Sequence, residues 1–419
     1  MAPLDLVLDS YEENHLDGTL VDALEGRAQG GTIRRVHLKS TDAEFLISML
    51  STLTPKSEEV QLSPMESFIL CNFNGALPVN VSDFFAISHF PNLQHLQLIG
   101  CTISSWDYLS SRINTLTDLH LDLKYPPPNS TTSQLLSVLK SNPLLQAVTL
   151  SGNTVPDSDD SSSFSVPLKH LRHLKVTGDS RHVLRVLGQL DHPVVLEKIC
   201  IILSKCTVKE ISQIIGPYFR KHIQHLGHSQ SGLKLHLLPS GNHIRVQLGS
   251  VVGMAPEPME VGEDAVLEVS LDSSQPPLEA EVVLGLISHC PLEELVYLKV
   301  VGEIAAIGDI YTRLSNLRTL NLTNVPLAVP FPENSGADRD VLSSLQNLIL
   351  NDPTLDECDW DPLTSFLTDR VSSGKQLDIF VTDSESYMCV EVVERIKGLV
   401  QKFHSDLAGR GPRPFYIGQ

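Results

Sequence analysis

The chain has 419 residues, 42% of them hydrophobic but only 5% aromatic, so a large interior has to be built from aliphatic side chains. This length exceeds one ordinary globular core and predicts either several domains or one repeat array. The formal net charge of −19 excludes nucleic acid and anionic membranes as expected partners, because both are bound largely through Lys and Arg.

Cysteine usage and the N-terminal residues predict an intracellular protein. The seven cysteines are widely spaced and include no Cys-x-x-Cys pair, which favours reduced, buried thiols over a disulfide framework or a zinc site. Asp5 and Asp9 lie where a signal peptide needs a basic and then an apolar region. No run of about 18 uncharged apolar residues is present, so no transmembrane helix is expected.

A template of the form Leu-x-x-Leu-x-Leu, with other aliphatic residues in place of some leucines, recurs along nearly the whole chain. Its mean spacing is roughly 28 residues, which is typical of leucine-rich repeats. The last two template positions predict a short strand with one buried face. In chain order the copies are Leu4/Leu6/Leu8, Ile33/Val36/Leu38, Val60/Leu62, Leu93/Leu96/Leu98, Leu116/Leu119/Leu121, Leu145/Val148/Leu150, Leu171/Leu174/Val176, Leu196/Ile199/Ile201, Leu267/Val269, Leu295/Leu298/Val300, Leu317/Leu320/Leu322, Leu345/Leu348/Leu350 and Leu377/Ile379.

Segments between these strands have apolar residues three or four apart and predict helices. One strand–helix unit cannot cover its own apolar face, so neighbouring units must stack. The pattern therefore predicts an α/β fold: an irregular leucine-rich-repeat solenoid with a curved parallel sheet inside and helices outside. Cys101 and Asn153 occupy the turn position that such repeats give to Asn or Cys. The clearest helical segments are residues 45–53, 135–139, 183–187 and 282–287.

The repeat rhythm is interrupted after residue 206. Residues 207–226 have the pattern of a long amphipathic helix, which Pro217 should kink or split. The expected domains are N-terminal repeats over 1–206, a helix-and-hairpin insertion over 207–272, and C-terminal repeats over 273–419.

A β-hairpin insertion is predicted within the array. Residues 233–238 and 243–248 alternate in hydrophobicity on either side of a Pro-Ser-Gly-Asn turn. Residues 267–271 continue the strand pattern after the Pro- and Glu-rich loop 254–264.

Two further segments each allow two interpretations. Residues 156–166, rich in Asp and Ser, predict a solvated loop, with a phosphorylated regulatory loop as the alternative. Near the C-terminus an apolar stripe predicts a helix that caps the final repeat, with a partner-binding amphipathic helix as the alternative. The pairs Glu391–Arg395 and Glu394–Lys397 would lie on its solvent side. The stripe consists of Val390, Val393, Ile396, Val400 and Phe403.

The repeats, Cys101 and residues 206–220, which read CTVKEISQIIGPYFR, resemble the large fungal family of F-box and leucine-rich-repeat proteins. Residues 2–8 resemble the segment that follows the F-box helices in that family, so the likeness covers essentially the whole chain. It implies that the repeats hold a protein substrate of a cullin ubiquitin ligase, to which an F-box attaches through the Skp adaptor. Residues 11–28 lack the Leu-Pro start and the apolar residues of an F-box. The Skp adaptor is therefore expected as a partner only if an F-box is encoded upstream of Met1.

The residues between the template leucines are predicted to form a concave face that binds a protein partner. In the copy at Val60 and Leu62, Glu59 and Gln61 would lie on this face. The face is mixed polar with few aromatic or Arg anchors, so a solvated face without a ligand is the alternative. The candidate binding residues are Arg35, His37, His95, Gln97, Asp118, His120, His173, Lys175, Tyr297, Lys299 and Asn321.

Catalysis, cofactors and metals are not expected. The chain lacks the phosphate loop, the His-Glu-x-x-His motif, the nucleophile elbow and the dinucleotide-binding glycine pattern. His95 and His120 lie near acidic positions, but nothing fixes a coordination geometry. We therefore predict a non-enzymatic protein-interaction scaffold. The alternative is a regulator of a small GTPase that presents Arg35, Arg172 or Arg318.

Overall fold

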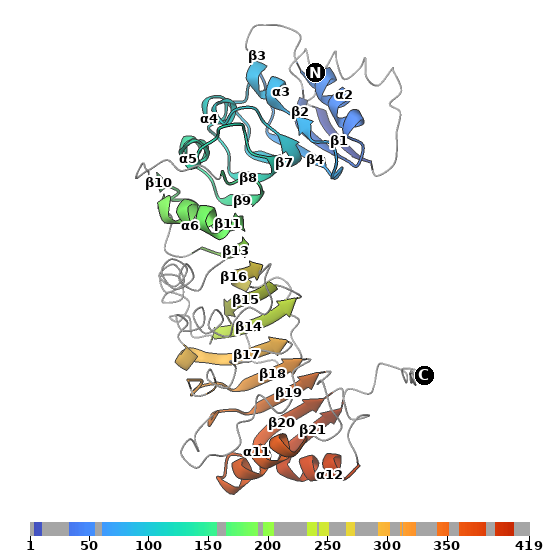
Figure 1. Cartoon of the computed structure of the whole chain (residues 1–419), viewed down its shortest axis with the longest axis vertical. Helices are drawn as coiled ribbons and strands as arrows, with labels where there is room; N and C mark the ends of the chain where they lie inside the picture. Colours follow the sequence, from blue (N-terminus) through green and yellow to red (C-terminus); the bar gives the residue numbers. More distant parts are fainter. Residues whose placement is uncertain are drawn as a thin grey trace. The chain divides into compact units, whose positions relative to one another are not determined.

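The chain folds into two units, Met1–Ser204 and Lys205–Gln419, in the computed structural model (Figure 1). Among the described helices, none is both long and apolar enough to cross a membrane. The domain boundaries expected after residues 206 and 272 stay predictions. The structure describes residues 4–10, 33–54, 61–156, 165–191, 196–204, 233–240, 243–250, 265–272, 292–301, 311, 313–323, 342–351, 360–382 and 390–405.

The described part of the first unit is built on eight parallel strands, which follow one another across the sheet in chain order (Figure 1). In most of these strands burial alternates, as at Val36 and Leu38 of the second strand, because one face of the sheet is covered. The strands are β1 (Leu4–Ser10), β2 (Ile33–Ser40), β4 (Ser67–Asn72), β7 (His95–Thr102), β8 (Asp118–Tyr125), β9 (Ala147–Gly152), β11 (His173–Asp179) and β13 (Lys198–Ser204). Short parallel pairs join β3 (Gln61–Leu62) to β6 (Ser88–His89), β5 (Val79–Asn80) to β7, and β10 (Val166–Pro167) to β12 (Leu190–Asp191).

Five described helices contribute to the core of the first unit. The first packs against β2, the last packs against β11, and each helix packs against the next one in the chain. Capping side chains fix where they begin: Asp42 accepts hydrogen bonds from the backbone N–H groups of Glu44 and Phe45, and Thr131 forms a capping box with Gln134. The helices are α2 (Ala43–Leu53), α3 (Ser82–Ile87), α4 (Asp107–Arg112), α5 (Thr132–Ser141) and α6 (Ser180–Gln189).

The strand between β2 and β7 is not where the aliphatic pattern predicted it. That prediction, at Val60 and Leu62, was wrong, because β3 at this point pairs with β6 and not with the large sheet. The strand of the sheet is β4, in which the buried Phe68 and Leu70 follow the buried Met65 at the template spacing. Met and Phe in template positions hid this copy from a search for aliphatic triplets.

Phe68 is the centre of an aromatic cluster beneath the sheet. Its ring stacks on Phe84 with the centroids 4.8 Å apart and meets Phe85 edge-on at 5.7 Å. Phe90 lies against Phe84 at 5.3 Å. The cluster packs one face of β4 into the core, and the alternate residues of β4 lie on the opposite face.

The turns after the strands use side chains to bind backbone carbonyls. The thiol of Cys101 is 3.3 Å from the carbonyl oxygen of Ile99, and the amide of Asn153 donates to the carbonyl oxygen of Lys124 at 2.8 Å. This is the role predicted for Cys101 and Asn153 from their spacing. None of the three described cysteines forms a disulfide, and all three are buried: Cys71, Cys101 and Cys200.

The described strands of the second unit begin with three antiparallel strands and continue as parallel ones (Figure 1). The hairpin and the strand that continues it are confirmed as β14 (Leu233–Ser240), β15 (His243–Ser250) and β16 (Ala265–Asp272). From β14 the sheet continues in parallel through β17 (Leu295–Val301), β18 (Thr319–Thr323), β19 (Asn347–Asn351), β20 (Leu377–Thr382) and β21 (Val400–Ser405). The described helices are η2 (Leu292–Glu294), α11 (Trp360–Ser372) and α12 (Val390–Leu399).

The apolar stripe predicted as one C-terminal helix divides between a helix and a strand. α12 ends at Leu399, and Val400 and Phe403 belong to β21. A spacing of three residues fits both a helix and the repeat template, so the pattern alone could not separate them. Phe403 stacks on Phe380 of β20 with the centroids 5.5 Å apart. Val390 is 73% exposed and lies outside the buried stripe.

The last predicted template is also shifted, by three residues. Leu377, Phe380 and Thr382 are the buried residues of β20, whereas Ile379 is only half-buried and pairs with Asn347. A phenylalanine in the middle template position again explains the error.

Several predictions lie wholly or mostly outside the described residues. These are the helices over 207–226 and 282–287, the loop over 254–264, and the interior of the loop over 156–166.

Candidate functional site

Two rows of side chains cross the exposed face of the first sheet. Neighbouring parallel strands lie about 4.8 Å apart, so residues at paired positions of successive strands become neighbours. At the position between Arg35 and His95, where Glu59 was expected, the row contains Ser67, and Ile69 replaces Gln61 in the other row. The first row is Arg35, Ser67, His95, Asp118, Ala147, His173 and Lys198. The second row is His37, Ile69, Gln97, His120, Thr149, Lys175 and Cys200.

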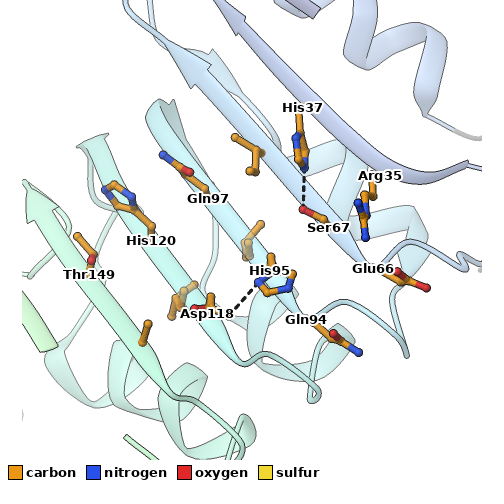
Figure 2. A pocket seen from close by; sticks show the side chains of 14 residues that line it. Arg35, His37, Glu66, Ser67, Gln94, His95, Gln97, Asp118, His120 and Thr149 are labelled. Atoms are coloured by element: carbon orange, nitrogen blue, oxygen red, sulfur yellow. Dashed lines mark hydrogen bonds and ion pairs between the residues drawn. The ribbon is translucent and has the colours of Figure 1, made fainter. Parts of the chain in front are cut away.

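A hollow of about 510 Å³ lies over these rows between β2 and β9. Figure 2 shows its side chains standing on one face of the strands, with helices behind the sheet. Six of the predicted binding residues line it: Arg35, His37, His95, Gln97, Asp118 and His120. The other lining residues are Leu96, Leu119, Ala147 and Thr149, together with Glu66, Ser67, Ile69 and Gln94, which the pattern missed. The Met-x-x-Phe-x-Leu spacing before and within β4 was the signal for Ser67 and Ile69.

A histidine–aspartate contact lies on the floor of the hollow. Nδ1 of His95 is 2.8 Å from Oδ2 of Asp118, which also accepts a hydrogen bond from the hydroxyl of Thr117 at 2.7 Å (Figure 2). The two paired side chains are about half-exposed, so the pair contributes little to stability. Its effect is to occupy the carboxylate of Asp118.

His37 lies at the β2 side of the hollow against a buried hydroxyl. Its Nε2 is 2.9 Å from Oγ of Ser67 (Figure 2). Burial lowers the pKa of His37, and the positive charges of Arg35 and Lys39 lower it further, although Asp5 acts in the opposite direction. The neutral imidazole is therefore the favoured form near pH 7.

The carboxylates at the β1 side of the hollow are paired with arginine. Arg34 donates to both oxygens of Asp5 at 3.2 and 3.1 Å and lies 3.9 Å from Glu66. Its hydrogen bond holds the pKa of Asp5 below the usual value. Arg35 lies 3.8 Å from Asp5 and is itself exposed.

Four consecutive members of the second row have no hydrogen-bond partner within the described residues. We call this set the donor row, because each member has at least one N–H or O–H group. Burial lowers the pKa of His120, Asp122 on the same strand acts to raise it, and Lys175 lowers it. The donor row comprises Gln97, His120, Thr149 and Lys175, from β7, β8, β9 and β11.

His173 and Lys175 extend the rows beyond the hollow. His173 is 3.2 Å from Glu197, which also lies 3.4 Å from Arg172. Both imidazole and carboxylate are exposed here.

The remaining predicted residues lie in the second unit, on two neighbouring strands. The amide of Asn321 donates to the hydroxyl of Tyr297 at 3.3 Å, and Lys299 pairs in register with Asn321. Burial raises the pKa of Tyr297. These three residues form a local cluster of β17 and β18.

Within the described residues, no group of three or more His, Cys, Asp or Glu side chains has the arrangement of a metal site. No protein-family model matches the chain, and no curated protein matches it. The fold that the structure shows is a mixed α/β fold with a large parallel sheet and helices.

Proposed function

We propose that the chain is an irregular leucine-rich-repeat solenoid whose first unit binds a protein partner on the open face of its sheet. The in-register stacking of parallel strands, with described helices between several of them, supports the repeat class. In this view the protein is a non-enzymatic scaffold that resembles the substrate-binding repeats of an F-box ubiquitin-ligase receptor.

The observation that carries the proposal is the donor row, of which Gln97, His120 and Thr149 line the hollow and the exposed Lys175 lies beyond it. Half-buried polar groups such as these first three are normally satisfied by hydrogen bonds, and a row of donors on consecutive strands offers a partner several directed contacts at once. A merely solvated sheet face would not need to gather these groups beside a hollow of about 510 Å³.

Site-specific photocrosslinking tests the proposal. A photoreactive benzoylphenylalanine would replace Gln97 in the hollow or, as a control, the exposed Lys140 of α5. We expect a discrete protein to be crosslinked from a cell extract at position 97 and not at 140, and excess unmodified chain should compete for it. The same crosslinked species at both positions, or none at either, would contradict a binding role for this face.

Ligase assembly and GTPase regulation are separate questions with their own assays. Retention of a purified Skp adaptor by the chain tests the first. GTP hydrolysis by candidate GTPases with and without the chain tests the second. Among the described arginines, Arg172 is held by Glu197 and Arg35 lies close to Asp5, so neither is as free as an arginine that is presented to a nucleotide.

A further inference from the structure

The donor row differs in charge from the rest of the protein. The chain contains 50 Asp and Glu residues against 31 Lys and Arg residues, yet the second row from His37 to Lys175 contains no carboxylate. A carboxylate of a partner could therefore approach this row without meeting another carboxylate in the row, although the chain as a whole is acidic.

The carboxylates around the hollow are already engaged within the protein. Asp118 binds His95 and Thr117, while Asp5 and Glu66 lie against Arg34. Asp122 is the nearest opposing charge, because it follows His120 by two residues on the same face of β8. The donor row therefore has unused hydrogen-bond donors, whereas most nearby acceptors are occupied.

Resting on the proposed function, we infer that the donor row binds an acidic, extended segment of the partner protein. Carboxylate oxygens of Asp or Glu would accept hydrogen bonds from the amide of Gln97, the imidazole of His120 and the ammonium group of Lys175. Three strand spacings of about 4.8 Å separate the ends of the row, or about 14 Å, which an extended segment of about four residues spans. Such a segment could place two carboxylates on the row, since alternate residues of an extended chain point the same way.

The imidazole of His120 should strengthen this contact when it becomes charged. His120 pairs in register with Gln97 of β7 and Thr149 of β9, Lys175 of β11 lies one strand further, and Asp118 and Asp122 are on its own strand. A bound carboxylate would offset the repulsion from Lys175 and favour the protonated ring. Acidic segments should therefore bind more tightly below neutral pH.

A display library of random 12-residue peptides, panned on the full chain, tests the inference. We expect the enriched peptides to gain Asp and Glu relative to the input library. A fluorescein-labelled synthetic copy of one enriched peptide should bind the Lys175→Glu variant about tenfold more weakly or worse, because a charge-assisted hydrogen bond is replaced by repulsion. The matched control Lys140→Glu, on the helical side of the same unit, should leave its affinity unchanged. Thr149→Val removes one donor without changing charge and should weaken binding severalfold.

The outcomes separate this inference from the proposed function. Peptides that depend on Gln97 and Thr149 but are neutral or basic would overturn the acidic segment and leave a binding face. Acidic peptides that bind Lys175→Glu and wild type equally would also overturn it. A selection that yields no peptide sensitive to the donor row would overturn the proposed function as well. Circular dichroism of each variant shows whether it is folded.

Discussion

Replacing Phe68 by alanine tests whether β4 belongs to the core of the first unit. The ring is 0% exposed and contacts Phe84 and Phe85 at centroid distances of 4.8 and 5.7 Å. Truncating a buried phenylalanine costs about 3–5 kcal/mol, and two lost aromatic pairs place this site toward the upper end. The first unit has 204 residues, for which 1 kcal/mol shifts the Tm by about 2–4 °C. We expect the Tm to fall by about 6–20 °C.

Phe73→Ala is the matched control, because Phe73 follows the same strand but is 46% exposed. Its loss should cost about 1 kcal/mol or less, since less apolar surface is returned to water. Urea denaturation followed by circular dichroism gives both free energies of unfolding. Equal losses for the two variants would refute the assignment of Phe68 to the core and, with it, the position of Ser67 and Ile69 in the hollow.

Three further predictions follow from single groups. Gly100 has a φ of +65°, and a Cβ there would overlap the carbonyl oxygen of Asn72, so Gly100→Ala should destabilise the protein by at least about 1–3 kcal/mol. Gly188 lies in a helix with open space around it, so Gly188→Ala should stabilise the protein by about 0.5–1 kcal/mol. Thermal denaturation that shifts the stability of both variants in the same direction would contradict the geometry. Arg370 is buried and donates hydrogen bonds to the carbonyl oxygens of Leu342 and Leu345 at 2.7 and 2.6 Å. Arg370→Met should therefore lower the free energy of unfolding, measured by urea denaturation, by about 2–4 kcal/mol. The same substitution at the exposed Arg313 should leave it close to unchanged. Burial lowers the folded-state pKa values of His37 and His120, so the unfolded chain binds more protons than the folded chain and stability should fall as the pH drops below about 6.5. The difference in Tm between pH 7.5 and pH 5.5 should therefore be smaller in a double variant with His37→Gln and His120→Gln. An unchanged difference would show that other groups cause the pH dependence.

Much of the fold was predictable because regular burial of one face produces a periodic pattern of hydrophobic residues in the sequence. Leu96 and Leu98 of β7, or Leu119 and Leu121 of β8, alternate with less buried residues, and a strand with one covered face requires this. The helices over residues 45–53, 135–139 and 183–187 were found for the same reason, at the helical period. The sequence also identified the hairpin, since its turn residues lie between two alternating runs.

The errors have one physical origin. The core requires volume and apolarity at a template position, and Phe68 or Phe380 satisfies it as well as a leucine does. A search restricted to aliphatic residues therefore moved β4 and shifted the position of Ile379. The division between α12 and β21 was missed because Val400 and Phe403 are three residues apart, which suits either element.

Those errors changed the predicted site more than they changed the predicted fold. Each strand contributes one residue to a row, so the neighbours of His37 are set by which strand follows β2, and not by residues near it in the chain. Placing the next strand at residues 60–62 put acidic Glu59 and polar Gln61 beside Arg35 and His37. The correct strand puts Ser67 and Ile69 there, which removes a carboxylate from the hollow and gives His37 a hydroxyl to bind.

The same reasoning explains why recognition by this surface would be a property of the sheet and not of any one strand. Gln97, His120 and Thr149 come from three neighbouring strands, and each alone is an ordinary polar residue. Stacking at about 4.8 Å aligns them without any local sequence motif. Because side chains alternate between the two faces, a shift of one residue in any strand would replace a donor in the row by a core residue. The buried triplets that hold the register therefore also define the chemistry of the opposite face.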